Sequence, residues 1–457
     1  MLPPSFIESL AGTGLDAAGR DALCRTLEAG ETPVSVRFNP YKLAERPEGE
    51  GVPWNRYGFY LAERPRFTLD PLFHAGVYYV QEASSMFLEH IYRSLFGEGE
   101  RLRILDLCAA PGGKSTLLAT AAGLESVVVA NEVIRARALT LADNIRKWGL
   151  GNVAVTSNDP SHFGALEHWF DLIAVDAPCS GEGMFRKNPE ATAQWSPQAV
   201  ELCAGRQRRI LSEVWSALRP GGILIYSTCT FNRRENEENV AWLVENYDCE
   251  GVRIETDPAW GIVRGEVPAG EGVPVPVFRF FPHAVRGEGF FCAVIRKAEG
   301  RVRTRLSKPR RTVFTEATRQ EQASLRPWFG QPEFMHFVRI GDQMYGYYEE
   351  AYPAVREVAE RLSVLYSGVH AGQLYHGKLK PEHPLALFHD LAREAVPQAE
   401  LGETAALGYL RRGDIPADGL AEGMNLVCFE GVPLGWIKRI GNRTNNLYPK
   451  ELRIQNL

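Results

Sequence analysis

Two cysteines and one aspartate follow apolar segments of this chain, in positions where their side chains could do chemistry. Asp176 and Cys179 lie in "VDAPCSGEGMFRK", directly after the apolar run 172–175, and Cys229 lies in "YSTCT" at the end of another apolar run. A thiolate is a strong nucleophile that can form a covalent intermediate, whereas a free cysteine more often packs as a small hydrophobic side chain. The choice between chemistry and packing depends on whether the fold brings the two thiols together.

Five apolar segments between residues 100 and 297 alternate with helical patterns. They lie in "LRILDLCAAPGGK", "SVVVANEV", "VAVTSND", "FDLIAVDAP" and "GGILIYSTCT". This alternation predicts a parallel sheet with helices on both faces, and "VFRFFPHAVRGEGFFCAVIRK" predicts an antiparallel hairpin at its edge. The expected fold class is therefore α/β, a Rossmann-like doubly wound sheet, with an α+β segment before it and an α+β to β-rich region after it. Because adjacent parallel strands lie about 5 Å apart, the ends of the fourth and fifth strands would place Cys179 and Cys229 in one pocket.

A glycine-containing turn links the first strand to the helix that follows it. This turn, in "LDLCAAPGGK" at 105–114, lets the backbone approach a ligand closely, and the start of the helix offers free N–H groups. It is neither the G-x-G-x-x-G dinucleotide fingerprint nor a P-loop, so a different ligand is expected. Glu132, Asp159 and Asp176 follow the second, third and fourth strands, at the sheet edge where doubly wound folds bind ligands. A carboxylate after the second strand suits the hydroxyl groups of a ribose.

The composition narrows the class of protein. The 457 residues are 45% hydrophobic and 23% charged, which is typical of soluble globular proteins with roughly two to four domains. A net charge of −5 excludes a wholly basic surface, so contacts with nucleic acid would come from local patches. The chain has no apolar stretch of roughly 20 residues and no leader pattern, so we expect a cytoplasmic protein without a membrane partner. The eight cysteines form no C-x-x-C pair, which argues against a disulfide framework or a metal site.

Changes in composition divide the chain into five parts. An N-terminal segment at 1–80 precedes the sheet domain at 81–298. A linker at 299–315 carries six basic residues from Arg301 to Arg311, and we expect it to contact phosphate groups. A mixed α+β segment at 316–395 and a small β-rich module at 396–457 complete the chain.

Three motifs in this order give the chain a resemblance to a known family. "CAAPGGK" at 108–114, "DAPCSGEG" at 176–183 and "STCT" at 227–230 resemble those of RNA cytosine-C5 methyltransferases of the RsmB/NOP type. "YYVQEASSM" at 78–86 and the C-terminal "GWIKRIGNRTNNLYPKELR" look like the bacterial branch that acts on small-subunit ribosomal RNA and carries a C-terminal PUA-like region. The resemblance is close over 78–297 and looser at both ends.

The resemblance implies a cofactor, S-adenosylmethionine, and a set of site residues. The implied cofactor-binding residues are Cys108, Ala109, Ala110, Pro111, Gly112, Gly113, Lys114, Glu132, Asp159 and Asp176. Cys229 is implied as the nucleophile, because C5 of cytosine takes up a methyl group only after a covalent addition at C6. Cys179 would then assist release of the enzyme from its product, and Asp176 could hydrogen-bond the cytosine edge.

The expected partner is RNA, bound by local groups of basic side chains. Cytosine in a duplex hides C6, so the target base must be flipped or lie in an accessible loop. Trp436 and Tyr448 lie among the basic residues of the tail and could stack on bases. The candidate RNA contacts are Arg37, Asn39, Arg186, Lys187, Lys438, Arg439, Arg443, Lys450 and Arg453.

Several alternatives remain at this point. A DNA cytosine-C5 methyltransferase takes its nucleophile from a Pro-Cys motif, which this chain also has at Pro178 and Cys179, although the additional Cys229 favours RNA. A transfer RNA could replace ribosomal RNA as the substrate. A non-catalytic RNA-binding assembly factor would not need two thiols at strand ends, and a methyltransferase for small molecules or proteins would not need the basic segments. Nothing in the sequence suggests more than a monomer.

Overall fold

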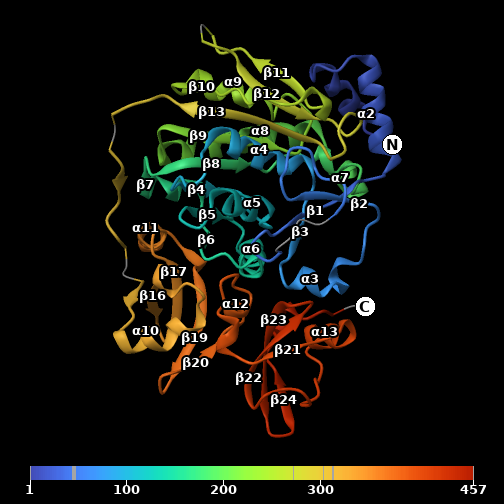
Figure 1. The fold of residues 1–457 in the computed structure, drawn as a ribbon. Coiled ribbons are helices and arrows are strands. Elements are labelled where there is room, and N and C mark those ends of the chain that lie inside the picture. The colour runs from blue at the N-terminus through green and yellow to red at the C-terminus, as the bar shows by residue number, and fades with distance from the viewer. Residues whose placement is uncertain (1, 44–47, 271, 302, 311–312, 456–457) are drawn as a thin grey trace.

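The computed structural model describes residues 2–43, 48–270, 272–301, 303–310 and 313–455, and a mixed sheet runs through its centre (Figure 1). The strand order is β11-β12-β13-β9-β8-β4-β5-β6-β18, and β10 pairs with β13 outside this path. The bounds are β4 Arg103–Asp106, β5 Val127–Asn131, β6 Val153–Thr156, β8 Phe170–Asp176, β9 Leu218–Thr228, β10 Cys249–Gly251, β11 Val263–Val267, β12 Val275–Phe280, β13 Phe290–Lys297 and β18 Val364–Ser367.

The five predicted parallel strands are confirmed as β4, β5, β6, β8 and β9. The first of them, β4, lies in the middle of this group, with β5 on one side and β8 on the other. Strand order therefore reverses at β4, which places a ligand site at the carboxyl ends of these strands. The predicted antiparallel hairpin is β12 and β13, and β13 pairs with β9. The expected fold class is thus confirmed.

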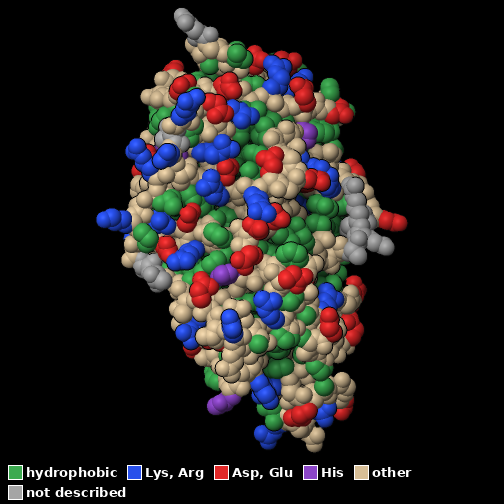
Figure 2. All heavy atoms as spheres, turned by 60° about the vertical axis from the view of Figure 1, so that its left-hand side comes forward, with side chains coloured by type: hydrophobic (Ala, Val, Ile, Leu, Met, Phe, Trp, Pro, Cys, Tyr) green, Lys and Arg blue, Asp and Glu red, His purple; other side chains and the backbone are tan. Residues whose placement is uncertain are grey.

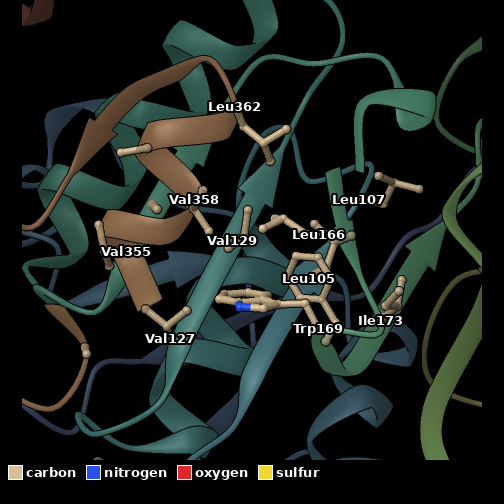
Figure 3. Packing of buried hydrophobic residues seen from close by; sticks show 14 of the residues in the cluster. Leu105, Leu107, Val127, Val129, Leu166, Trp169, Ile173, Val355, Val358 and Leu362 are labelled. Atoms are coloured by element: carbon tan, nitrogen blue, oxygen red, sulfur yellow. The ribbon is translucent and has the colours of Figure 1, made fainter. Parts of the chain in front are cut away.

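Helices cover both faces of the sheet and bury its apolar side chains. One face packs against α4, α5 and α6, and the other packs against α8, α9 and α11. Figure 3 shows Val355 and Val358 of α11 beside Val127 and Val129 of β5. The helix bounds are α4 Phe87–Leu95, α5 Gly113–Ala122, α6 Arg135–Trp148, α7 Pro189–Gln194, α8 Pro197–Val214, α9 Glu237–Asn246 and α11 Tyr352–Arg361.

The segment at 316–395 is more closely joined to the central sheet than the sequence suggested. Its strand β18 pairs antiparallel with β6, and its helix α11 covers part of one sheet face. The indole of Trp169 donates a hydrogen bond of 2.6 Å to Glu357 of α11. The rest of the segment forms a second sheet and two short helices. Their bounds are β15 Thr315–Glu316, β16 Met335–Ile340, β17 Gln343–Tyr348, β19 Val369–Tyr375, β20 Lys378–Pro381, α10 Arg319–Leu325 and α12 His383–Ala386.

The two ends of the chain pack against each other. Val36 and Phe59 of the N-terminal segment share one apolar cluster with Tyr409, Leu434 and Tyr448 of the C-terminal module. Figure 1 shows α3 next to α13 and β23, where these parts meet. The bounds are α1 Pro4–Ser9, α2 Ala17–Ala29, β1 Val34–Phe38, β2 Gly58–Leu61, α3 Pro71–His74, β3 Tyr78–Val80, β21 Gln398–Glu400, α13 Glu403–Leu410, β22 Gly423–Phe429, β23 Val432–Ile440 and β24 Arg443–Asn446.

Part of the basic linker pairs with the sheet domain. Its strand β14 (Arg305–Leu306) pairs with β7 (Leu166–Glu167), while Arg311 lies outside the described residues. On the face in Figure 2, Lys and Arg side chains are interspersed with Asp and Glu, as a net charge of −5 leads one to expect. Among the described helices none is both long and apolar enough to cross a membrane.

Candidate active site

A cleft of ≈ 580 Å³ opens at the carboxyl ends of the parallel strands. The turn after β4, the end of β8 and the end of β9 form one side of it, and the N-terminal segment forms the other. The lining residues from the predicted site are Cys108, Ala109, Ala110, Pro111, Gly113, Lys114, Asp176, Lys187 and Cys229. The sheet therefore brings the 108–114 turn and one of the two candidate thiols into one cavity.

The thiols of Cys179 and Cys229 lie side by side, with 3.2 Å between their sulfur atoms. This proximity follows from the parallel pairing of β8 with β9, in which Asp176 is opposite Ser227. The hydrogen bond with Cys229 and burial raise the pKa of Cys179 well above its usual value. At neutral pH Cys179 is therefore held in the protonated form, as a group that can exchange a proton with its neighbour.

Lys114 and Asp176 form an ion pair beside the thiols. The Lys114 ammonium lies 2.8 Å from the Asp176 carboxylate, which also accepts a hydrogen bond of 2.9 Å from the hydroxyl of Ser227. Burial acts to lower the pKa of Lys114, but the nearby Asp176 and Asp106 carboxylates raise it above its usual value. Lys114 thus stays protonated, and its charge fixes the Asp176 carboxylate at the floor of the cleft.

Two buried glutamates hold the thiol-bearing loops together. Glu235 accepts hydrogen bonds from the backbone and side chain of Ser180, next to Cys179. Glu182 accepts bonds from the backbone N–H groups of Phe231 and Asn232, just after Cys229. Each glutamate therefore links the loop after β8 to the loop after β9. Sequence reasoning assigned no role to either glutamate. Glu235 lies in "FNRRENEEN", which is typical of a solvated polar segment, and Glu182 lies in "DAPCSGEG", where only Asp176 and Cys179 were singled out.

The turn after β4 contains a carboxyl group with an unsatisfied oxygen. Asp106 is fully buried, and its Oδ2 accepts a hydrogen bond of 2.6 Å from the Ser115 hydroxyl, while its Oδ1 has no hydrogen-bond partner. Burial raises the pKa of Asp106 to about 6. Gly112, the residue directly before α5, has a φ of 117°, a backbone conformation that favours glycine. The turn therefore has a backbone that a ligand can approach closely, and the carboxyl group of Asp106 lies beneath it.

The buried Asp106 predicts a pH-dependent stability. A carboxyl whose folded-state pKa is raised from 3.8 to about 6 destabilises the fold when ionised, so this penalty is absent in strong acid and complete above about pH 6. Asp106→Asn removes the charge and should gain stability relative to wild type by about 2 kcal/mol more at pH 7.5 than at pH 4.5. Urea unfolding at both pH values measures this difference, with exposed Asp418→Asn as the baseline. An equal effect of Asp106→Asn at both pH values would contradict the prediction.

Comparisons with known proteins place the chain in a family. The model of "16S rRNA methyltransferase RsmB/F" matches residues 96–296, and models of an RsmF N-terminal domain and an RsmF PUA domain match 2–83 and 396–454. Ribosomal RNA small subunit methyltransferase F of Erwinia tasmaniensis is 32% identical, over 98% of this chain and 96% of that protein. The chain belongs to the RsmB/F methyltransferase family. The protein of the same description from Salmonella agona is 33% identical over 95% of this chain and 90% of its own length.

Solved structures agree with the RsmB/F fold. A methyltransferase homolog from Pyrococcus horikoshii superposes with a TM-score of 0.50 at 29% identity, covering 65% of this chain and all of that one. NSun6 from the same organism has a TM-score of 0.52 at 20% identity, covers 65% of this chain and 99% of its own, and shows likeness of fold alone.

Two acidic residues predicted to bind the cofactor lie beside the cleft rather than in its lining. Glu132 is buried, accepts a hydrogen bond of 2.9 Å from the backbone of Ile134, and lies 3.4 Å from Arg137. Asp159 lies 2.8 Å from Arg209 of α8. Their binding of a cofactor stays a prediction.

Three of the residues predicted to contact RNA are internal. Arg37 and Asn39 are 1% and 0% exposed, and both make hydrogen bonds within the protein. Arg186 is buried against Glu288 at 2.9 Å. The prediction that these side chains contact RNA directly is therefore wrong. Their residue types suggested exposure, but the partners that bury them come from distant parts of the sequence.

The remaining basic RNA candidates lie at the surface, whereas the two aromatic candidates do not. Lys187 lines the cleft and lies 3.0 Å from Glu288. Trp436 and Tyr448 are buried, so their predicted stacking on bases is wrong. Lys438, Arg443, Lys450 and Arg453 are exposed, and Arg439 is half-buried.

Proposed function

We propose that this chain methylates C5 of cytosine in 16S ribosomal RNA through a covalent bond between Cys229 and C6 of the base. The observation that carries the proposal is the distance of 3.2 Å between the sulfur atoms of Cys179 and Cys229, at a cleft that Cys229 lines. Cys229 would add to the base, and Cys179 lies beside the sulfur that must gain a proton when the product is released. The names of the relatives, ribosomal RNA small subunit methyltransferase F, support ribosomal RNA as the substrate.

The residues of the cleft suit S-adenosylmethionine as the cofactor. The turn Cys108–Lys114 provides a glycine-containing backbone at the start of α5, and Asp106 below it has a carboxylate oxygen free to accept a hydrogen bond. Glu132, Asp159 and Asp176 would hold the polar parts of the cofactor. When bound, this cofactor supplies an electrophilic methyl group on its sulfonium.

The chain's own side chains account for the remaining chemistry. Cys229 forms the bond to C6, which moves electron density to C5, and the proton displaced from C5 on methylation must then be removed. The Asp176 carboxylate, fixed by Lys114 and Ser227, can accept a hydrogen bond from the exocyclic amine of cytosine. In the release step the electron pair of the C5–H bond restores the ring double bond as the bond from C6 to the Cys229 sulfur breaks. Cys179 gives its proton to the departing Cys229 sulfur, and the Cys179 thiolate that results accepts the proton lost from C5, so both thiols are regenerated and the product is released.

Basic side chains at the cleft and on the C-terminal module would bind the RNA substrate. Lys187 would bind phosphate beside a flipped base at the cleft, and Lys438, Arg439, Arg443, Lys450 and Arg453 would bind RNA from the C-terminal module. We also propose the division at 1–80, 81–298, 299–315, 316–395 and 396–457 as functional units. In this proposal the protein acts as a monomer in the cytoplasm.

A methylation assay with several nucleic acids tests the function. The purified protein is incubated with labelled S-adenosylmethionine and 16S ribosomal RNA, assembled small subunits, transfer RNA or duplex DNA. We expect 5-methylcytidine, detected by mass spectrometry, in 16S ribosomal RNA or the assembled subunit alone. Methylation of transfer RNA or DNA instead would overturn the substrate assignment, and RNA binding without methylation would favour an assembly factor.

A further inference from the structure

Three side chains of the N-terminal segment point into the sheet domain and not toward solvent. Arg37 comes from β1, and Asn39 and Lys42 follow it in the next turn. We call these three residues the N-terminal anchor. Each donates hydrogen bonds to the start of α5 or the end of α6, the two helices on either side of the cofactor turn.

Arg37 binds the first turn of α5. Its Nη2 donates hydrogen bonds of 3.1 Å to the carbonyl of Gly113 and 2.6 Å to the hydroxyl of Thr116. Its Nε donates to the side chain of Gln81 at 2.8 Å, and its guanidinium lies 4.5 Å from the ring of Trp148. Hydrogen bonds from a buried cation are stronger than those between neutral groups, so Arg37 fixes the position of Gly113 in the cleft wall.

Asn39 and Lys42 bind the end of α6. The Asn39 amide donates a hydrogen bond of 2.8 Å to the carbonyl of Trp148, and the Lys42 ammonium donates one of 2.7 Å to that of Lys147. Carbonyls at a helix end have no partner within the helix, so these two donors satisfy groups that would otherwise be unpaired. Burial lowers the pKa of Lys42 to about 7, and its amino group can donate these bonds in either protonation state. Gly76 lies so close that a Cβ would be 2.0 Å from the Lys147 carbonyl oxygen. The N-terminal segment is therefore tightly seated on α6.

Two side chains of α6 contact the cofactor turn itself. Arg137 donates a hydrogen bond of 3.1 Å to the carbonyl of Ala110, and Asn144 donates one of 2.8 Å to that of Pro111. Together with Arg37 on Gly113, side chains bind three carbonyls of the turn. The anchor thus contacts the turn directly, through the bond from Arg37 to Gly113. It also acts indirectly, because Asn39 and Lys42 hold α6, and α6 in turn binds the turn.

We propose that the N-terminal anchor positions the 108–114 turn for cofactor binding, so that Arg37, Asn39 and Lys42 are positioning residues; this inference rests on the function proposed above. A turn held in its binding conformation spares the ligand the entropic cost of ordering it. Loss of the anchor would therefore weaken the binding of cofactor and leave the affinity for RNA unchanged.

Calorimetry on the full-length protein tests this inference. The variants are Arg37→Met and, as a control from the same segment, exposed Arg66→Met. We expect Arg37→Met to raise the Kd for S-adenosylmethionine and S-adenosylhomocysteine by roughly 10- to 100-fold, the effect of losing a charged hydrogen bond. Amide hydrogen exchange at 108–116 should become faster in this variant, while its Kd for 16S ribosomal RNA should match that of wild type. Arg66→Met should behave as wild type in all three measurements.

A second pair of variants covers the case in which Arg37→Met does not fold. Thr116→Ser keeps the hydroxyl that accepts from Arg37, and Thr116→Val removes it, so only the valine variant should lose cofactor affinity. Unchanged cofactor affinity in folded Arg37→Met or in Thr116→Val would overturn the inference, as would a loss of RNA affinity alone. Failure of the wild type to bind S-adenosylmethionine would instead overturn the proposed function.

Discussion

Cys229→Ser is expected to abolish methyl transfer, with a loss of roughly 10⁴-fold or more, as for removal of other covalent nucleophiles. A serine hydroxyl keeps its proton at neutral pH and cannot add to C6 of cytosine as a thiolate can. The measurement is the rate of 5-methylcytidine formation in 16S ribosomal RNA. Serine differs from cysteine by one atom and leaves the 108–114 turn unchanged, so the Kd for S-adenosylmethionine should remain that of wild type.

A second cysteine variant separates the nucleophile from a general effect of thiol loss. Cys203 is half-buried on α8 and does not line the cleft, so Cys203→Ser should retain wild-type activity. Methylation by Cys229→Ser at a rate near that of wild type would show that another group attacks the base, and Cys179 would be the next candidate.

Cys179→Ser is expected to leave the enzyme bound covalently to its product. Bond formation at C6 needs only Cys229, whereas release needs a proton to be exchanged beside that sulfur, and Cys179 is the group 3.2 Å away. We expect release to slow by roughly 10²- to 10⁴-fold, the usual contribution of a positioned acid or base. A denaturing gel should show a slowly migrating band that disappears on treatment with RNase.

The double variant is the control for this band. Cys179→Ser combined with Cys229→Ser cannot form the bond to C6, so the slow band should be absent. A band that persists in the double variant, or an active Cys179→Ser enzyme with no band, would contradict the role assigned to Cys179.

The sequence was sufficient to predict the central sheet and the meeting of the two thiols. Short, strongly apolar segments such as 172–175 and 127–130 are typical of buried parallel strands. Parallel pairing then brings the ends of β8 and β9 together. The strand β18 could not be predicted as part of this sheet. Its four residues carry no signal for a partner more than 200 residues earlier in the chain, and only packing of α11 on the sheet places it beside β6.

Buried polar residues were the main source of error in the site. An arginine or glutamate in a single sequence suggests a solvated surface, since such residues are seldom fully buried without partners. Arg37 and Glu235 are buried because their partners, Thr116 and Ser180, are brought to them by the tertiary fold. A polar residue in a motif near the site can therefore have either of two roles. It can contact the substrate, or it can be buried and hold the residues of the site in place.

The shared core of the two chain ends has a consequence for synthesis of the protein. Val36 and Phe59 are among the first core residues to leave the ribosome, but Leu434 and Tyr448, which cover them, are among the last. The nascent chain therefore lacks the C-terminal part of this cluster until translation is almost complete, although Phe67, Ala75, Val77 and Tyr78 of the N-terminal segment are already present. A product that ends before residue 396 would keep the apolar surface that the C-terminal module covers exposed to solvent, and such surface makes a chain prone to aggregation and proteolysis.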